Sequence, residues 1–385
     1  MQENAIGLKI RIETLCSSLR MKSIITLFLF LSLRLIAADT ISAKITIMPL
    51  GDSITLGVGP AVPLAELNGY RRDLGDLLKS SGYDIDFVGS LANGDPDFTD
   101  KEHEGHPGWH DDQIAAGVYG FLTEHPAQIV LLHIGTNDIS ADPTYTNPAD
   151  VAAILDEIDR WEADNGKTVV VVLAAIINRN GHVCPNPSTT TTFNQNVRQM
   201  ALNRATNPVH ADRIVMVDLE CSAGLNYLSD MVDSTHPNAD GYAKMATKWF
   251  TDGLLAILPQ ADAGADQTVT GGKTVTLSGA GSIDPDNPDG AFSSVRWEQI
   301  SGKNPVTLGT PDELTTDFTA PAVDAEGDVL TFKLTVRDTD GLVGEDSVTV
   351  TITPAIEPVP DNGGGDDGGG SGGGGGCFIQ AVVNQ

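Results

Sequence analysis

Basic residues are scarce in this chain. It has 23 lysine and arginine residues against 52 aspartate and glutamate residues, so its formal net charge is −29 at pH 7. Proteins that bind nucleic acid neutralise phosphates with lysine and arginine, and anionic membranes attract the same side chains. The charge balance therefore argues against a nucleic-acid partner and against adsorption to an anionic membrane, whereas it suits a soluble exported protein.

Long apolar runs are also scarce, and the one that stands out follows Met21 and Lys22 and ends at Ala38. A lysine followed by a short apolar run and small residues is typical of a secretory signal peptide. This run, which Arg34 interrupts, is too short for a comfortable membrane span. We therefore expect residues 1–43 to be a leader whose signal peptide starts at Met21. The mature protein would then have no membrane span and would lie outside a bacterial cell or at its surface. An uncleaved amphipathic anchor is the alternative.

Cysteine occurs only four times. Cys16 belongs to the leader and Cys377 to the carboxyl-terminal tail, so Cys184 and Cys221 remain between them. Export to an oxidising environment favours a disulfide between this pair, which would stabilise the fold by about 3 kcal/mol on a chain-entropy estimate. Two separate buried thiols are the alternative.

The stretch from Ile45 to Gly57 contains the first candidate catalytic residue. Its apolar, β-branched start predicts a buried strand that stops at Gly51. Ser53 then follows the carboxyl end of an inner strand, where open α/β sheets bind ligands, and its hydroxyl is a candidate nucleophile. If a helix begins at Ile54, the backbone N–H of Ser53 is also available to an oxyanion. By itself, a Gly-Asp-Ser tripeptide is more often a plain turn.

A candidate base lies about 180 residues downstream, in the sequence Asp233-Ser-Thr-His236-Pro237. A serine hydroxyl needs a base to remove its proton, and an imidazole serves when a carboxylate fixes its tautomer. The three-residue spacing lets one tight loop present both Asp233 and His236. The alternative, a solvated loop with a chance histidine, is weakened by the presence of Ser53.

Two further strand ends carry candidate hydrogen-bond donors. The apolar run 128–134 precedes Asn137, whose side-chain NH2 can donate to a developing negative charge, and the run 85–88 precedes Gly89, whose N–H no side chain covers. Serine, glycine, asparagine and histidine, each at the end of its own segment, resemble the four blocks of the SGNH (GDSL-type) hydrolases. The resemblance covers roughly residues 45–258.

Additional motifs narrow the resemblance to carbohydrate esterase family three, whose members are secreted enzymes that remove O-acetyl groups from xylan and similar glycans. The motifs are Gly69-Tyr-Arg71, Phe87-Val-Gly89-Ser90, His103 to Trp109, Leu132 to Asp138, and Asp233-x-x-His-Pro-Asn238. The resemblance implies Ser53 as nucleophile, His236 as general base and acid, and Asp233 as the residue that orients it. It also implies an oxyanion hole of Gly89, Asn137 and the Ser53 amide, with no cofactor or metal. The Ser-Thr pair between Asp233 and His236 departs from the commoner Gly-Val.

The segment from His103 to His110 holds three histidines and a glutamate within eight residues. Gly-His-Pro-Gly breaks any helix, so this is not the helical His-Glu-x-x-His arrangement of zinc proteases. The family resemblance makes it a substrate loop beside the acyl pocket, with His106 in the loop and Trp109 as an apolar wall or sugar-stacking face. A structural turn is the alternative, and zinc ranks last.

Apolar strand runs alternate with helical patterns up to residue 259. The five strands predict one mostly parallel sheet covered by helices on both faces, a three-layer sandwich with flavodoxin-like strand order. The expected helices are 70–78, 110–122, one around 151–158 that ends at Asn165-Gly166, 192–203, and a long last helix over 239–258. We expect this catalytic domain to span residues 44–259.

Residues 261–353 lose the helical period and show short alternating runs between Gly, Asp, Asn and Pro turns, which predicts a small β-sandwich. Gly279 to Asp286, Trp297 and Leu334 to Asp338 resemble an immunoglobulin-like PKD domain, a type of spacer or glycan-contacting module. Three turn carboxylates, Asp284, Asp286 and Asp289, have the chemistry to hold calcium, but their spacing misses the EF-hand loop. A solvated turn is therefore favoured.

The tail, residues 354–385, is rich in glycine from Gly363 to Gly376 and cannot bury a core, so it is expected to be a flexible tether. Cys377-Phe-Ile379 after the glycine run resembles surface-attachment tails of some bacteria. The alternative is a disordered end with one exposed thiol.

Taken together, these patterns predict a secreted serine esterase that removes O-acetyl groups from polysaccharide through an acyl-enzyme. The same residues also suit a GDSL-type lipase or arylesterase that acts on lipid or small esters. A glycan-binding surface module with a vestigial esterase domain is the alternative of another class. The polysaccharide, the acetyl position and the oligomeric state stay open.

Overall fold

The computed structural model describes residues 44–59, 67–179, 181–207, 212–288 and 290–355. The expectations about the leader, the tail from residue 356 on, and Asp289 fall outside these residues.

The amino-terminal half is built on five parallel strands. They are β1 (Ile45–Gly51), β2 (Ile85–Phe87), β5 (Ile129–His133), β6 (Val170–Ala175) and β7 (Ile214–Asp218), and they lie in the order β2-β1-β5-β6-β7. This is the expected flavodoxin-like order. Strands β1, β5 and β6 are almost wholly buried, because helices cover both faces of the sheet.

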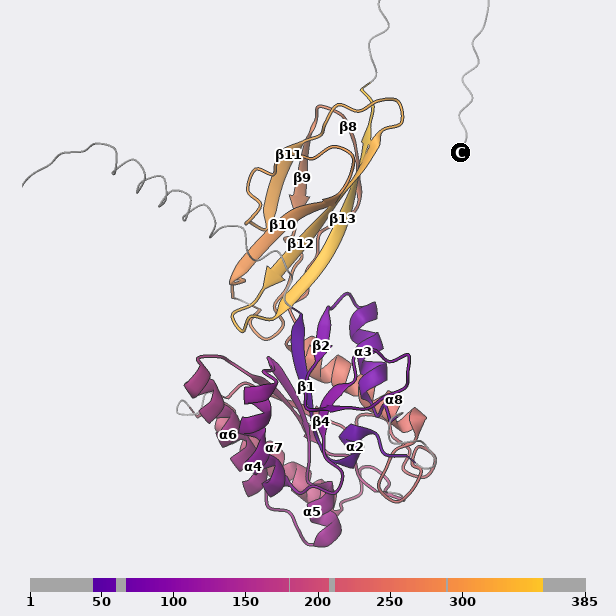
Figure 1. Ribbon diagram of the computed structural model, residues 1–385, viewed down its shortest axis with the longest axis vertical. Helices are drawn as coiled ribbons and strands as arrows, with labels where there is room; N and C mark the ends of the chain where they lie inside the picture. Colours follow the sequence, from indigo (N-terminus) through magenta and orange to yellow (C-terminus); the bar gives the residue numbers. More distant parts are fainter. Residues whose placement is uncertain (1–43, 60–66, 180, 208–211, 289, 356–385) are drawn as a thin grey trace, which may run out of the picture.

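Figure 1 shows the two helical layers. Helices α3 (Arg71–Ser80) and α8 (Ala239–Lys248) pack together on one side of the sheet. Helices α4 (Asp111–Glu124), α6 (Ala149–Asn165) and α7 (Thr189–Ala205) cover the other. The predicted three-layer α/β sandwich is therefore confirmed. Because all five strands run the same way, their carboxyl ends lie along one edge, which holds the candidate catalytic residues.

The structure corrects the expected single helix over 239–258. Helix α8 ends at Lys248 and continues as a π-helical segment, η2 (Trp249–Gly253), and a 3-10 turn, η3 (Leu254–Ala256). A Cβ at Gly253 would lie 2.7 Å from Cγ1 of Val172, so the chain approaches strand β6 too closely for any larger residue. This close approach accompanies the change in helical pitch.

Four short elements complete this part of the chain, and three of them were not expected; the fourth is the helix considered at Ile54. Strand β4 (Glu102–Gly105) pairs in parallel with the end of β1, and β3 (Leu91–Ala92) pairs antiparallel with β4. Short helices follow two inner strands, α2 (Ser53–Leu56) after β1 and α5 (Thr136–Ala141) after β5. All four lie near the carboxyl ends of the parallel strands, so they add to the edge that carries the candidate site.

The carboxyl-terminal half is the expected β-sandwich. One sheet contains β10 (Ser294–Ser301), β12 (Asp328–Arg337), β13 (Val343–Thr353) and β8 (Gln267–Thr270), and the other contains β9 (Thr274–Ser278) and β11 (Thr315–Thr319). Most pairs are antiparallel, whereas β8 runs parallel to β13. The buried positions of β12 alternate, and its inward residues pack around Trp297.

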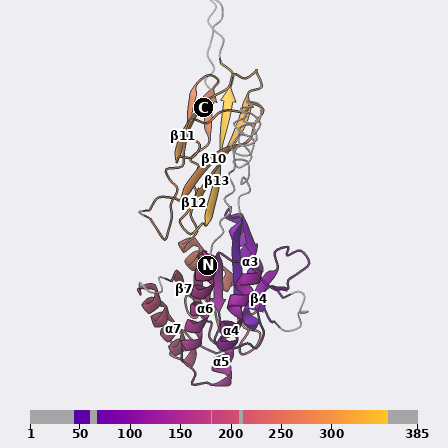
Figure 2. The same cartoon turned by 60° about the vertical axis from the view of Figure 1, so that its left-hand side comes forward.

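The sandwich rests on the amino ends of the parallel strands. Leu342, in the turn between β12 and β13, is fully buried in the core of the α/β half. Nε2 of Gln128, just before β5, donates to the Gly341 carbonyl at 2.9 Å, and Arg213, just before β7, pairs with Asp340. Figures 1 and 2 show this stacking from two directions. The sandwich therefore lies at the end of the sheet opposite the candidate site.

The expectation of a solvated turn is wrong for Asp284. This residue is only 3 % exposed, and neither of its carboxylate oxygens has a hydrogen-bond partner among the described residues. Burial, and then the neighbouring Asp284, raise the pKa of Asp286 to about 7. The turn thus places two acidic groups close together near the junction, where Arg213 approaches Asp286 at 4.0 Å.

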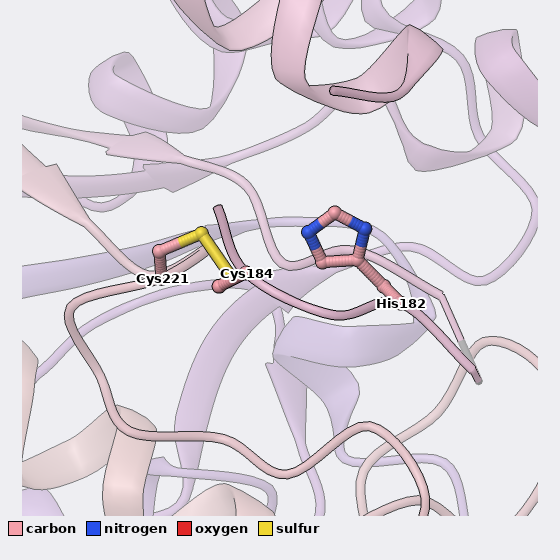
Figure 3. Close-up of side chains that lie close together, drawn as sticks. All are labelled: His182, Cys184 and Cys221. Carbon is pink, nitrogen blue, oxygen red and sulfur yellow. A yellow bond between two sulfur atoms is a disulfide. The ribbon is translucent and has the colours of Figure 1, made fainter. Parts of the chain in front are cut away.

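Cys184 and Cys221 form a disulfide, so the alternative of two separate thiols is wrong. Figure 3 shows the imidazole of His182 beside it. Within the described ranges, these three residues are the one group of potential metal ligands whose ligand atoms all lie within 4.8 Å of one another. The sulfurs of a disulfide are not thiolates, and thiolates are the form of cysteine that binds metals.

In the part of the chain that the structure describes, no helix has the length and hydropathy needed to cross a membrane.

Candidate active site

Ser53 lies where strand β1 gives way to helix α2. Asp52 caps this helix, because its Oδ1 accepts a hydrogen bond from the Ile54 amide at 2.9 Å. Ser53 is therefore the first helical residue, and it is 8 % exposed. Asp52 is fully buried, and burial raises its pKa to about 6 despite this hydrogen bond. The sequence did not single out Asp52, which fixes the turn that presents the hydroxyl.

The loop before α8 brings the candidate base to Ser53. Nε2 of His236 lies 2.9 Å from Oγ of Ser53, and Nδ1 of His236 lies 2.8 Å from Oδ2 of Asp233. The other oxygen of Asp233 accepts the amides of Thr235 and His236, both at 2.7 Å. The loop is therefore tight even though Ser-Thr departs from the family pattern. Its Asp233 and His236 form a continuous hydrogen-bonded relay with the hydroxyl of Ser53.

The charge of Asp233 fixes the direction of this relay. Burial raises the pKa of Asp233, but the hydrogen bonds from the side chain and backbone of His236 outweigh burial and hold the pKa below its usual value. An ionised carboxylate only accepts hydrogen bonds, so Nδ1 of His236 carries the hydrogen that faces it. In the neutral ring, Nε2 then has no hydrogen and faces the Ser53 hydroxyl, which is the arrangement that a general base requires.

The candidate oxyanion donors stand at the ends of neighbouring strands. Asn137 lies in the first turn of α5, and its Nδ2 donates to the Trp109 carbonyl at 2.8 Å. That contact uses one of the two amide hydrogens and orients the group, and the second hydrogen remains for a substrate oxygen. Helix α5 follows β5, whose last residue, His133, is in register with Gly51 at the end of β1.

Gly89 follows β2 and packs against the backbone of β4. A Cβ at Gly89 would lie 2.3 Å from the carbonyl carbon of His103, so a side chain has no room there. Strand β4 is in register with the end of β1, Leu50 opposite Glu104 and Gly51 opposite Gly105. Gly89 is therefore held by a strand that runs directly beside the one leading to Ser53.

His106 and Trp109 form an aromatic group with Phe121. The His106 ring stacks on Trp109 with centroids 4.1 Å apart and on Phe121 at 5.1 Å. The His106 amide donates to the Gly51 carbonyl at 2.8 Å, which ties the segment to the end of β1. Both residues of the expected substrate loop are thus brought to the candidate site, although part of the segment is strand β4 and not a loop.

The three histidines of this segment contact different groups. Nδ1 of His103 accepts the Gly105 amide at 2.9 Å, and burial lowers the pKa of His103 to about 2. His106 contacts Glu104, and Nδ1 of His110 lies 2.8 Å from Oδ1 of Asp138. Glu104 and Asp138 lie within the motifs that narrowed the resemblance, but they were not among the candidate residues, because the motifs alone do not show which side chains these carboxylates contact.

Two family profiles match the chain. The profile described as the GDSL-like Lipase/Acylhydrolase family matches residues 50–244, and a profile described as a PKD domain matches residues 263–352. The predicted resemblance to GDSL-type hydrolases and to PKD domains is thereby confirmed.

Individual relatives cover parts of the chain. A multidomain esterase of Ruminococcus flavefaciens is 27% identical over 237 residues, which are 54% of this chain and 28% of that protein, so the match spans little more than a quarter of the relative. The structure of a Clostridium thermocellum family 3 carbohydrate esterase is 29% identical and covers 55% of this chain and 96% of that one, with a TM-score of 0.46. The solution structure of the PKD domain from KIAA 1837 protein is 31% identical and covers 26% of this chain and 91% of that one, with a TM-score of 0.22.

Proposed function

The chain belongs to the GDSL-like Lipase/Acylhydrolase family, a family of carboxylic ester hydrolases, and from this premise we propose that it is an exported serine esterase that removes O-acetyl groups from polysaccharide. The observation that carries the proposal is the relay in which Asp233, His236 and Ser53 are joined by contacts of 2.8 and 2.9 Å. Such a relay is what a serine hydroxyl needs to act as a nucleophile at neutral pH.

In the acylation step, Oγ of Ser53 attacks the acetyl carbonyl carbon while Nε2 of His236 takes the hydroxyl proton. Asp233 stabilises the imidazolium that forms. The carbonyl oxygen becomes an oxyanion, which accepts hydrogen bonds from the amides of Ser53 and Gly89 and from Nδ2 of Asn137. The intermediate collapses when the sugar oxygen leaves with the proton from His236, and an acetyl ester of Ser53 remains.

In the deacylation step, His236 removes a proton from a water molecule that attacks this ester. The second tetrahedral intermediate uses the same three donors, and it collapses to acetate with return of the proton to Ser53. Every proton passes through Nε2 of His236, and the residues named supply the whole cycle.

The substrate class rests on the motifs shared with carbohydrate esterase family three and on Trp109. This indole is partly exposed beside the candidate site, so its face is available to a sugar ring. An acetyl group is small and a sugar is polar. We therefore expect hydrolysis of acetate esters to exceed that of longer acyl esters.

The test is acetate release from acetylated xylan, pectin, alginate and chitin, together with p-nitrophenyl esters of two, four and eight carbons. The Ser53→Ala variant is the control. The proposal expects acetate from at least one of the O-acetylated glycans, xylan, pectin or alginate, and activity that falls with acyl length. Chitin carries N-acetyl groups, so acetate from chitin alone would contradict the proposed ester specificity. Activity that rises with acyl length would favour a lipase or arylesterase instead. A Ser53→Ala protein as active as the wild type would end the mechanism.

The PKD-type sandwich is proposed to act as a spacer or as a second contact to glycan, since it lies away from the candidate site. The rival view is a surface module that binds glycan and no longer hydrolyses esters. Full-length Ser53→Ala protein separates the two in a pull-down with insoluble glycans. Retention on a glycan whose acetyl groups the wild type leaves intact would favour the rival.

A further inference from the structure

Glu104 is a fully buried carboxylate in strand β4, directly opposite Leu50 of β1. In the described part of the chain, no lysine or arginine forms an ion pair with Glu104. The one basic side chain within ion-pair distance of it there is that of His106. Burial of a carboxylate is costly unless several donors satisfy it. The identity of those donors therefore indicates what the residue does.

Both oxygens of Glu104 hold the segment after β2. Its Oε1 accepts the Ser90 amide at 2.5 Å, and the Ser90 hydroxyl donates to Oε2 at 3.0 Å. Ser90 follows Gly89, so the donated N–H belongs to the peptide unit that joins these two residues. The amide hydrogen bond orients that peptide unit, and the hydroxyl contact holds the Ser90 side chain against the same carboxylate, so Glu104 helps to fix the place of Gly89.

One of these oxygens, Oε2, also holds the aromatic group formed by His106, Trp109 and Phe121. Nε2 of His106 lies 2.8 Å from Oε2 of Glu104, and the His106 side chain is 13% exposed. The ring of His106 stacks on Trp109, and the carbonyl of Trp109 is the acceptor that orients Asn137. A chain of direct contacts thus runs from the Glu104 carboxylate through His106 and Trp109 to Asn137, the side-chain donor of the candidate oxyanion hole.

We propose that Glu104 is a positioning residue that sets the oxyanion hole from both sides, Gly89 through Ser90, and Asn137 through His106 and Trp109. This inference rests on the proposed esterase function. An oxyanion hole is effective only when its donors are fixed before the charge develops, so small displacements of the donors slow the chemical step more than they weaken substrate binding.

A carboxylate suits all three contacts as they stand. The Ser90 amide can only donate, the Ser90 hydroxyl donates to Oε2, and His106 donates when Nε2 carries its ring hydrogen. In Glu104→Gln, an NH2 at the Oε1 position would face the Ser90 amide, a second donor. At the Oε2 position it would force the Ser90 hydroxyl to accept and His106 to change tautomer, so the network is altered in either orientation. The variant has nearly the same volume, so it changes hydrogen bonding with little change in packing.

The experiment compares Glu104→Gln with wild type in kcat and KM for p-nitrophenyl acetate. A second readout is the rate at which a fluorophosphonate labels Ser53. This reaction also places an oxygen in the oxyanion hole, but it needs no particular substrate. We expect kcat and the labelling rate to fall by about 10- to 100-fold, the usual range for losing an outer positioning contact, with KM changed by less than about threefold.

Glu220 offers a matched control. It is a buried carboxylate that also accepts three hydrogen bonds, from Asn178 at 2.7 Å, Thr191 at 2.5 Å and Asn194 at 3.0 Å. None of these partners belongs to the proposed oxyanion hole. Glu220→Gln is expected to lower the melting temperature but to keep kcat within about twofold of wild type, so it separates positioning from general loss of a buried contact.

A second variant, Ser90→Ala, removes only the hydroxyl contact to Glu104 and keeps the amide contact. If Glu104→Gln fails to fold, we expect Ser90→Ala to fold and to lose at least about threefold in labelling rate. The inference is overturned if the fluorophosphonate labels Ser53 of the folded Glu104→Gln protein at the wild-type rate. If that variant does not fold, wild-type labelling of Ser90→Ala overturns the inference instead. It is also overturned if Glu220→Gln slows labelling equally. Failure of the proposed function has a different signature, namely a wild type that hydrolyses no more ester than Ser53→Ala does.

Discussion

The hydroxyl oxygen of Ser53 lies 2.9 Å from Nε2 of His236, although 183 residues separate them in the chain. Helix α8 explains this proximity. It packs on α3, and the hydroxyl of its Tyr242 donates to the carbonyl of Val58 at 3.1 Å, just beyond the helix that begins with Ser53. The loop that ends in His236 immediately precedes α8, so docking of this helix sets the distance between base and nucleophile.

Replacement of Asp233 by asparagine tests the direction of the relay. An amide NH2 in place of Oδ2 would face Nδ1 of His236 and favour the tautomer with hydrogen on Nε2, which cannot take the Ser53 proton. We expect kcat to fall by about 10²- to 10⁴-fold. The Asp233 side chain is 53% exposed, so a water molecule can take over the contact with Nδ1 of His236 and would reduce the loss towards about 10²-fold. Asp240→Asn, in the first turn of α8, is the control. Equal kcat in both variants would contradict the assignment.

Asn137→Ala tests the oxyanion hole by removing a proposed donor. Loss of one such donor typically costs about 100- to 1000-fold in kcat, and KM should change little because the interaction forms in the transition state. Asn165→Ala is a matched control, since Asn165 also donates from Nδ2 to a tryptophan carbonyl, that of Trp161, at 2.8 Å. Steady-state kinetics on p-nitrophenyl acetate decides. A KM effect without a kcat effect would make Asn137 a binding residue instead.

The positions of Ser53 and Asn137 could be predicted because each follows a continuous apolar run. Such runs predict buried parallel strands, and parallel strands bring their carboxyl ends to one edge. Asp233 and His236 were found for a different reason, namely that their spacing fits a single loop. Local sequence therefore identified these residues, whereas the distances between them depend on long-range packing.

Strand β4 and the role of Glu104 could not be predicted in this way. The sequence Glu-His-Glu-Gly has no apolar alternation, and its buried side chains are satisfied by residues outside the strand, such as Ser90 for Glu104. The change from α-helix to π-helix after Lys248 could not be predicted for a related reason. It accompanies the close approach of Gly253 to Val172, which the periodicity of 239–258 does not reveal.

The double variant Cys184→Ser/Cys221→Ser tests the stability that the disulfide provides. The bond joins residues 37 apart, and loss of a cross-link of this span should lower the free energy of unfolding by about 3 to 4 kcal/mol on the chain-entropy model. Denaturant unfolding with and without a reducing agent measures this change. The reductant should destabilise the wild type and leave the variant unaffected. A variant as stable as the oxidised wild type would show that the cross-link adds nothing.

Asp286→Asn tests the acidic pair near the domain junction through the pH dependence of stability. Burial, and then Asp284, raise the pKa of Asp286 from 3.8 to about 7, so the folded state binds this proton more tightly than the unfolded state does. The contribution of Asp286 to stability is therefore fully present below about pH 4 and is lost as pH rises through 7. With allowance for solvent screening of a side chain that is 25% exposed, the loss is about 1 to 2 kcal/mol.

The asparagine variant cannot ionise, so we expect it to lose less stability than the wild type between pH 4 and 8. Thermal unfolding between pH 4 and 8 measures the difference in stability between the two proteins. EDTA is present so that no divalent cation neutralises Asp284 and Asp286 in place of a proton. Asp312→Asn is the control, because Asp312 lies in the same domain and is 72% exposed. If the wild type and Asp286→Asn show parallel pH profiles, folding does not raise the pKa of Asp286, and the junction is stabilised in another way.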